Sequence, residues 1–140
     1  MSEKNKARVR RLLEEVVSQG KQESAEELLA VDFVDNAPMP GVSCTREGFM
    51  QTVQTIHASF PDFHVSVEDV VAEGDRVAVR WTATGTHTGG EIMGIPAVGN
   101  QVTVPAMQMY RIEDDRIAEV WENLDLAGLV EQLGADLPLG

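Results

Sequence analysis

The sequence has little of what many specialised sites require, beginning with cysteine. Cys44 is the only cysteine in 140 residues, which excludes an internal disulfide and any zinc or iron–sulfur site built from several cysteines. The three histidines (His57, His64 and His87) are scattered and form no His-x-x-x-His pair. No glycine-rich phosphate loop and no Gly-x-Ser-x-Gly motif occurs either. We therefore expect no metal ion and no nucleophilic triad.

Basic residues and long apolar runs are also scarce. Eleven Lys and Arg residues face 23 Asp and Glu residues, which gives a formal net charge of −12. A surface this negative repels phosphate groups and makes nucleic acids and anionic membranes poor partners. No apolar run approaches the ~18 residues that span a bilayer, and the start at 1–6 lacks the apolar stretch of a signal peptide. We expect a soluble, cytoplasmic protein with one domain over residues 1–140.

Helical periodicity dominates the first 60 residues. Apolar residues recur at spacings of three and four over 3–19, in a short segment after Ser24, and over 46–59. Ser24 and Thr45 are candidate N-caps, because their side-chain oxygens can accept a hydrogen bond from the first helical turn. A short β-like segment at 32–37 lies between the second helix and the third.

After Pro61 the periodicity changes to two, which is typical of strands with one buried face. The predicted strands begin at Phe63, Val77, Val102 and Ile117, and Asp125 caps a last short helix. Helices followed by antiparallel strands are typical of an α+β fold. A strongly curved antiparallel sheet wrapped around the N-terminal helices would form a cone, and polar groups on its concave side would line an internal pocket.

Two features of the strands concern the surface. The segment 88–101 holds four glycines and one proline, and so long a loop is a candidate lid or a contact with a partner subunit. Arg80, Thr82, Thr84 and Thr86 form a polar stripe of low charge on the outer side of their strand. Such a stripe suits face-to-face packing of two sheets, so we predict a homodimer.

The phase of the last two strands decides which polar groups point inward. If Val102 faces the core, then Gln108 and Tyr110 face it too, unless a bulge at Pro105 changes the phase. On the last strand one phase turns Glu122 inward, and the opposite phase turns Glu119 and its alternating neighbours inward. Periodicity leaves both open. A carboxyl group among apolar neighbours has a raised pKa and suits general acid/base catalysis near neutral pH, whereas a solvated Glu122 would do nothing.

Six further residues are candidates for lining a substrate pocket. Each also has a plain structural interpretation: the aspartate precedes a Pro/Gly turn, and the tryptophan and methionines suit a core. The histidine lies on the apolar stripe of its helix, where a hydrogen-bonded, partly buried histidine is common. The six are Asp35, His57, Trp81, Met93, Ile95 and Met107.

Several stretches follow one another in a recognisable order along nearly the whole chain. They include Arg46-Glu47-Gly48-Phe49, Phe60-Pro61-Asp62-Phe63, Gly85-Thr86-His87-Thr88-Gly89, Met93-Gly94-Ile95-Pro96 and Trp121-Glu122-Asn123-Leu124-Asp125. In these stretches the chain resembles the SnoaL-like polyketide cyclases. The resemblance implies the α+β cone of the nuclear-transport-factor-2-like proteins, usually dimeric, with no cofactor and no metal.

The resemblance also implies a reaction. In cyclases of this family an acid on the last strand is the general acid/base of an intramolecular aldol condensation, and that acid matches Glu122. Val120 and Ala106 stand where relatives often have polar residues, and Asn36 stands where many have histidine, so this pocket is expected to be more apolar. The expected function is a cofactor-independent cyclase or isomerase acting on a hydrophobic, polyketide-like carbonyl compound. Gln108 and Tyr110 would donate hydrogen bonds to the developing enolate oxygen.

Two other functions stay open at this point. A non-catalytic binding protein for a small apolar ligand is favoured by the lack of a histidine beside Glu122. An epoxide hydrolase needs a water molecule held by several polar groups, commonly an Asp–Arg–Asp set. Arg80 is the strand arginine best placed by number, and its phase puts it on the polar face.

Overall fold

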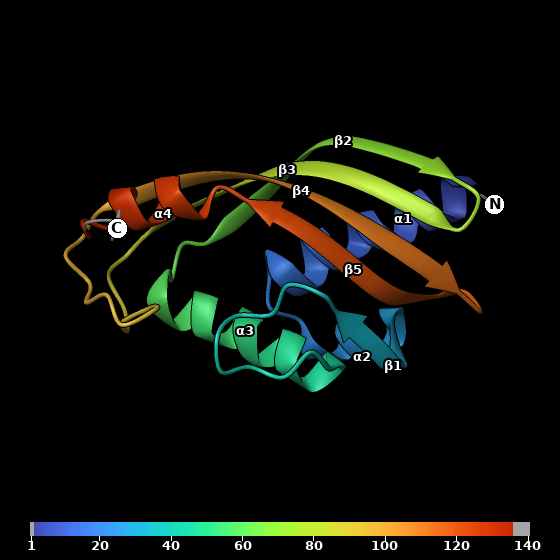
Figure 1. Cartoon of the computed structure of the whole chain (residues 1–140), viewed down its shortest axis with the longest axis horizontal. Helices are drawn as coiled ribbons and strands as arrows, with labels where there is room; N and C mark the ends of the chain where they lie inside the picture. The colour runs from blue at the N-terminus through green and yellow to red at the C-terminus, as the bar shows by residue number, and fades with distance from the viewer. Residues whose placement is uncertain (1, 136–140) are drawn as a thin grey trace.

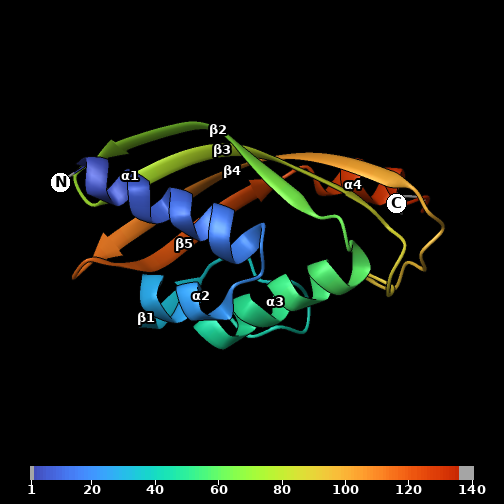
Figure 2. The same ribbon diagram turned by 180° about the vertical axis from the view of Figure 1, so that it is seen from behind.

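The fold is one curved, five-stranded sheet with helices against its concave face (Figures 1 and 2). A computed structural model describes residues 2–135. The strands are β1 (Leu29–Asp35), β2 (His64–Glu73), β3 (Arg76–Thr86), β4 (Gln101–Glu113) and β5 (Arg116–Leu124). The helices are α1 (Ser2–Arg11), the π-helical η1 (Leu12–Val17), α2 (Gln22–Leu28), α3 (Arg46–Ser59) and α4 (Leu126–Gln132). Within residues 2–135 no helix is long and apolar enough to cross a membrane.

The sheet has one strand more than the four antiparallel strands predicted. Its order is β1-β5-β4-β3-β2, and β1 runs parallel to β5 while the other pairs are antiparallel. Leu29 lies opposite Ile117, and Asp35 lies opposite Val120. The extra strand covers an edge of β5 that would otherwise be unpaired. The α+β class is confirmed, and the sheet is mixed rather than wholly antiparallel.

Local signals predict the third helix correctly but not the start of the second. α3 covers the predicted 46–59, and the Thr45 Oγ1 accepts a hydrogen bond from the Gly48 N–H at 3.2 Å. The prediction for Ser24 was wrong, because α2 already begins at Gln22. Ser24 is buried inside that helix and donates its hydroxyl proton to Glu15 at 2.7 Å. The Ser24 hydroxyl is therefore paired with a carboxylate elsewhere in the fold and does not cap the helix.

The central strand β4 alternates between buried and exposed residues along its whole length. Its buried residues, from Val102 to Ile112, face the helices. The register with β3 is continuous, with Pro105 opposite Thr82, so no bulge occurs at Pro105. Proline is tolerated there because the pairing of β5 with β4 ends at Leu124, opposite Ala106. The inward phase predicted for Gln108 and Tyr110 is therefore confirmed.

A register shift between β4 and β5 resolves the ambiguity of the last strand. Ile112 lies opposite Ile117, while Arg111 lies opposite Glu119, so Ala118 is an extra residue on β5. Such a bulge reverses the alternation of the strand that carries it. Both predicted phases are consequently present: Ile117 is buried before the bulge, and Val120 and Glu122 share the inner side after it.

The last helix packs against the long loop rather than against the first helix. Leu133, which follows α4, is buried with Phe60, Ile92 and Val102, and Leu129 packs against the same cluster. The N-terminal helix contributes to a different cluster, which includes Leu12 and Val16. The apolar residues Leu126, Leu129 and Val130 predict a contact of the last helix either with the first helix near Leu12 and Val16 or with the loop that carries Ile95. Leu129 and Ile95 both pack against the cluster around Leu133, which favours the second contact. Among residues 2–135, the cluster that includes Leu12 and Val16 contains no residue of α4.

The two leucines of this region provide a stability test. Leu133 is 1% exposed, and Leu126 on the same segment is 51% exposed. Leu133→Ala should lower the free energy of unfolding by about 2–5 kcal/mol, because it removes buried methyl groups and leaves a cavity. Leu126→Ala should change it by less than about 0.5 kcal/mol. Urea unfolding of both variants checks this, and equal losses would contradict the packing of Leu133.

Candidate functional site

Four side chains on three adjacent strands form a connected polar cluster on the inner face of the sheet. Gln108 lies at its centre on β4. Its Oε1 accepts hydrogen bonds from the Trp81 indole N–H at 2.8 Å and from the Tyr110 hydroxyl at 2.5 Å. Its Nε2 donates to the Glu122 Oε2 at 2.5 Å. The cluster thus links two aromatic donors to one carboxyl group.

Glu122 is a partly buried carboxyl group whose charge is disfavoured by its surroundings. Burial is the largest influence and raises its pKa above the ordinary value for glutamate. The hydrogen bond from Gln108 opposes this rise, and the negative charge of Asp35 adds to it. A carboxyl group in this situation can exchange protons at a pH closer to neutral than a free glutamate can.

Asp35 brings a second carboxyl group to the same region from the end of β1. Its Oδ1 accepts the backbone N–H of Ala37 at 2.9 Å, as expected of an aspartate before a Pro/Gly turn. Burial raises its pKa, and the hydrogen bond from Ala37 partly offsets that rise. Asp35 lies opposite Val120, two residues before Glu122 on β5, and its negative charge raises the pKa values of Glu122 and Tyr110.

Tyr110 is completely buried, and its hydroxyl stays protonated. Burial, together with the charges of Glu122 and Asp35, raises its pKa well above 10. The phenol is therefore a neutral donor, and its proton is directed to the Oε1 of Gln108. The structure places Tyr110 behind Gln108 rather than at an exposed position.

Two of the predicted pocket residues lie away from this cluster. Met107 precedes Gln108 on β4 and so points to the opposite face, where it is 61% exposed. The prediction that it lines an inner pocket fails on this alternation. His57 lies near the end of α3. Its Nε2 donates a hydrogen bond to the carbonyl oxygen of Val17 at 2.9 Å, and its ring packs in a T-shaped arrangement with that of Phe63. These contacts tie α3 to η1.

Met93 and Ile95 lie in the glycine-rich loop. Met93 has a positive φ of 51° and precedes Gly94, and the backbones of Ile92 and Ile95 bridge this turn. Ile92 is buried and Ile95 is partly buried in the cluster that also includes Phe60. The loop therefore has its own apolar anchor.

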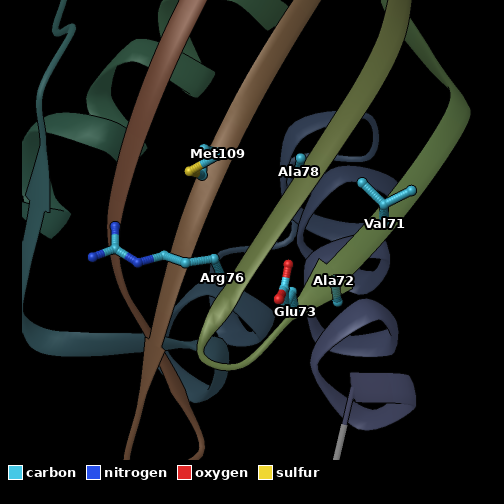
Figure 3. Close-up of a pocket in the computed structure, with 6 residues that line it drawn as sticks. All are labelled: Val71, Ala72, Glu73, Arg76, Ala78 and Met109. Carbon is cyan, nitrogen blue, oxygen red and sulfur yellow. The ribbon is translucent and has the colours of Figure 1, made fainter.

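Two depressions lie outside the polar cluster. The larger, about 460 Å³, lies on the outer face at the turn between β2 and β3 (Figure 3). There Arg76 extends across β4 and lies 5.0 Å from the ring of Trp121. The second, about 450 Å³, lies at the start of α2. The internal pocket stays a prediction. Across the described part of the chain, no three His, Cys, Asp or Glu side chains group in a way that could hold a metal ion.

The family follows from a comparison that covers most of the chain. The family model described as SnoaL-like polyketide cyclase matches residues 7–133. This chain belongs to that family. No curated protein matches it significantly.

Solved structures agree with the family in both fold and length. TsrD from Streptomyces laurentii has a TM-score of 0.86 at 28% identity, with 96% of this chain and 97% of that chain covered. IdmH from Streptomyces antibioticus, a proposed polyketide cyclase, has a TM-score of 0.80 at 34% identity, with 94% and 99% covered. AclR from Streptomyces galilaeus, a proposed hydroxylase, has a TM-score of 0.82 at 24% identity, with 96% and 98% covered. The fold is the α+β cone of the nuclear-transport-factor-2-like proteins.

The resemblance singles out Val120, Ala106 and Asn36 as departures from the family, and the structure shows what surrounds each of them. Val120 and Ala106 are both buried in the core cluster around the site. Asn36 points elsewhere and donates its amide to the Glu119 Oε2 and to the backbone oxygen of Val120, both at 3.0 Å. Apolar side chains therefore flank the cluster at Val120 and Ala106, and the comparison with the pockets of relatives stays a prediction.

The link from Trp81 to Gln108 does not follow from the sequence interpretation. The sequence indicates a core residue or a substrate platform at Trp81, and the register that brings it near Gln108 is not visible there. A usable signal is nevertheless present, because a buried indole N–H needs an acceptor and Gln108 is predicted to face inward.

Opposite pKa shifts on β5 predict opposite effects of pH. Burial raises the pKa of Glu122, so the fold loses stability as the pH rises from the unfolded value of about 4.3 towards the folded pKa. Asn36 and Arg111 lower the pKa of Glu119, so its stabilisation exists above the unfolded value and is lost as the pH falls through the folded pKa.

At neutral pH, Glu122→Gln should therefore be at least as stable as the wild type, and Glu119→Gln should be less stable. Both differences should shrink below about pH 4, where both glutamates are protonated in the unfolded chain. Urea unfolding between about pH 3.5 and pH 8 measures this. A loss of stability in Glu122→Gln that is independent of pH would contradict the assigned environment.

Proposed function

We propose that this protein is a cofactor-independent cyclase or isomerase that acts on a hydrophobic carbonyl compound, with Glu122 as the general acid/base. The main observation behind this proposal is that the carboxyl group of Glu122 faces the inner side of the sheet. Burial raises its pKa, and the Gln108 amide donates a hydrogen bond to it. The family membership supports a polyketide-like substrate and an aldol-type ring closure. Trp81 and the loop residues Met93 and Ile95 would contribute apolar surface around the substrate.

The reaction needs one group that removes and returns a proton. The Glu122 carboxylate takes a proton from the carbon next to a carbonyl group, and the electron pair of that C–H bond becomes an enolate. The enolate carbon attacks a second carbonyl carbon of the same substrate, whose C=O pair becomes an alkoxide. The alkoxide then takes the proton back from Glu122. The sum is one new C–C bond, with no external reactant.

Gln108 and Asp35 support this step in different ways. Gln108 Nε2 carries a second N–H besides the one donated to Glu122, and that proton can stabilise the enolate oxygen. Asp35 would orient the substrate or a water molecule, because it lies opposite Val120 on the neighbouring strand and its charge acts on Glu122. Both roles follow from proximity to the carboxyl group that takes the proton.

A binding protein for a small apolar ligand is the second candidate. The observation that favours it is the apolar character of Val120 and Ala106, which offer a ligand no hydrogen bond. The third possibility, an epoxide hydrolase, loses its support. Arg80 lies exposed on the outer face and binds Asp69 at 2.6 Å, so it does not reach the cluster.

Replacing the acid tests the main proposal. Glu122→Gln keeps the shape of the side chain and can still accept from Gln108, but it cannot take a proton. Deuterium exchange at the acidic carbon of a bound hydrophobic 1,3-dicarbonyl compound should fall by roughly 100- to 10,000-fold. NMR or mass spectrometry follows the exchange.

Glu119→Gln is the matched control, since it removes a carboxyl group from the same strand without touching the cluster. Its exchange rate should equal that of the wild type. Equal rates in wild type and Glu122→Gln would remove Glu122 from the mechanism. Binding of the probe without exchange in any form would favour the binding protein instead.

We also propose that two copies associate through the outer face of the sheet. Val71, Ala78 and Met109 lie in one row across three strands, and Met107 follows on β4. Val71, Met107 and Met109 are exposed apolar residues. The neighbouring charges of Arg80 and Asp69 neutralise each other. In a chain of net charge −12, this face is one where two copies can approach without strong repulsion.

Light scattering tests this association. The wild type should show about twice the 15.3 kDa of one chain, and Met107→Glu combined with Met109→Glu should show one chain, because it brings like charges together at the contact. Val31→Glu is the control, since Val31 is also an exposed apolar residue but lies on β1, at the opposite edge of the sheet from β2. A wild type of 15.3 kDa at micromolar concentration would contradict the proposal.

A further inference from the structure

The hydrogen bonds around Gln108 point to a role for two aromatic residues that acts through this amide and not through contact with the substrate. We infer that Trp81 and Tyr110 are positioning residues, which fix the Gln108 amide so that its NH₂ group, and not its oxygen, faces Glu122. This inference rests on the proposed function for its catalytic meaning. The orientation itself rests on three hydrogen bonds of Gln108: from the Trp81 N–H at 2.8 Å, from the Tyr110 hydroxyl at 2.5 Å, and to the Glu122 carboxyl group at 2.5 Å.

The tryptophan decides the orientation of the amide. An indole N–H can only donate, so the Gln108 atom that it meets at 2.8 Å must be the oxygen. The Tyr110 hydroxyl fills a second acceptor direction of the same oxygen. A rotated amide would place NH₂ against the indole N–H and oxygen against the carboxylate, which are two repulsive pairs in a buried site.

This orientation favours the ionised form of Glu122. An N–H donor stabilises a carboxylate, whereas a carbonyl oxygen would stabilise the protonated acid by accepting its proton. A base must be ionised before it can take a proton, yet burial and Asp35 both act against ionisation. The two aromatic donors therefore act through Gln108 to keep Glu122 available as a base.

The titratable groups near Glu122 leave the Gln108 amide as the route by which the aromatic residues act. Among the described residues, those groups are Asp35 of β1, whose charge acts on Glu122, and Tyr110 of β4, which belongs to the cluster. Tyr110 is 0% exposed and remains neutral, so it acts as a dipole and not as a charge. Trp81 of β3 carries no titratable proton. The effect of either aromatic residue must then pass through the amide that both contact.

The test removes each hydrogen-bond donor while an aromatic ring remains at both positions. Tyr110→Phe and Trp81→Phe each remove one hydrogen bond to Gln108, and the double variant removes both. In ¹³C-glutamate-labelled protein, with Glu122→Gln assigning the signal, the Glu122 carboxyl carbon should titrate at a higher pH in the double variant. Below the wild-type midpoint, exchange of the 1,3-dicarbonyl probe should fall by about 10- to 100-fold, the equilibrium effect of one charge-assisted hydrogen bond.

A thermodynamic cycle separates positioning from general damage. In a Gln108→Leu background, Tyr110→Phe should cause no further change in the titration of Glu122, because the connecting amide is absent. Phe49→Leu is the control for lost aromatic volume in the core, and it should leave the titration unchanged. A change caused by Tyr110→Phe in the Gln108→Leu background would overturn the inference, as would an unchanged titration in the Trp81/Tyr110 double variant.

The wild-type protein supplies a measurement that does not depend on whether the Trp81, Tyr110 and Gln108 variants fold. The Gln108 side-chain NH₂ signals should shift with the same midpoint as Glu122, and this shift should vanish in Glu122→Gln. Failure to see it would overturn the inference. If the titrations behave as expected but no form exchanges the probe, the positioning stands and the proposed function fails.

Discussion

The strict alternation of β4, fixed by its continuous register with β3, is the constraint on which the site depends. It forces Gln108 into the interior between Ala106 and Tyr110. A buried amide is costly unless its donors and acceptors are paired. Its oxygen is paired by Trp81 and Tyr110, and its NH₂ group by Glu122. The need to pair the hydrogen-bonding groups of buried Gln108 thus explains how the four side chains of the cluster are arranged.

The bulge at Ala118 is the second constraint, because it decides which glutamate of β5 faces inward. Glu119 lies on the outer side of β5, where Arg111 and Asn36 bind it and lower its pKa. Glu122, three residues later, faces the core, where burial raises its pKa. Two identical side chains on one strand therefore have pKa values shifted in opposite directions, and the extra residue decides which of the two faces the core.

What could be predicted from the sequence was mostly local. The Thr45 cap, the bounds of α3, the Asp125 cap and the alternation of β4 each depend on neighbouring residues, and all are confirmed. The parallel pairing of β1 with β5 and the bulge at Ala118 depend on partners distant in sequence. The phase of Glu122 depends on that bulge, so periodicity could name the residue as a candidate but could not orient it. The prediction for Met107 fails because an apolar side chain need not face inward, and alternation with Gln108 requires the opposite.

The apolar residues beside the cluster make the environment of Glu122 unusually dependent on one amide. With Val120 and Ala106 beside the site, Glu122 is surrounded by apolar groups that raise its pKa and offer no hydrogen bond. The amide of Gln108 is then the principal described group that opposes this rise, and its direction is set by two donors behind it. A site with several polar groups could share the control of its proton among them. Here that control is concentrated in one amide, so under the proposed function the residues that orient the amide matter as well as those that face the substrate.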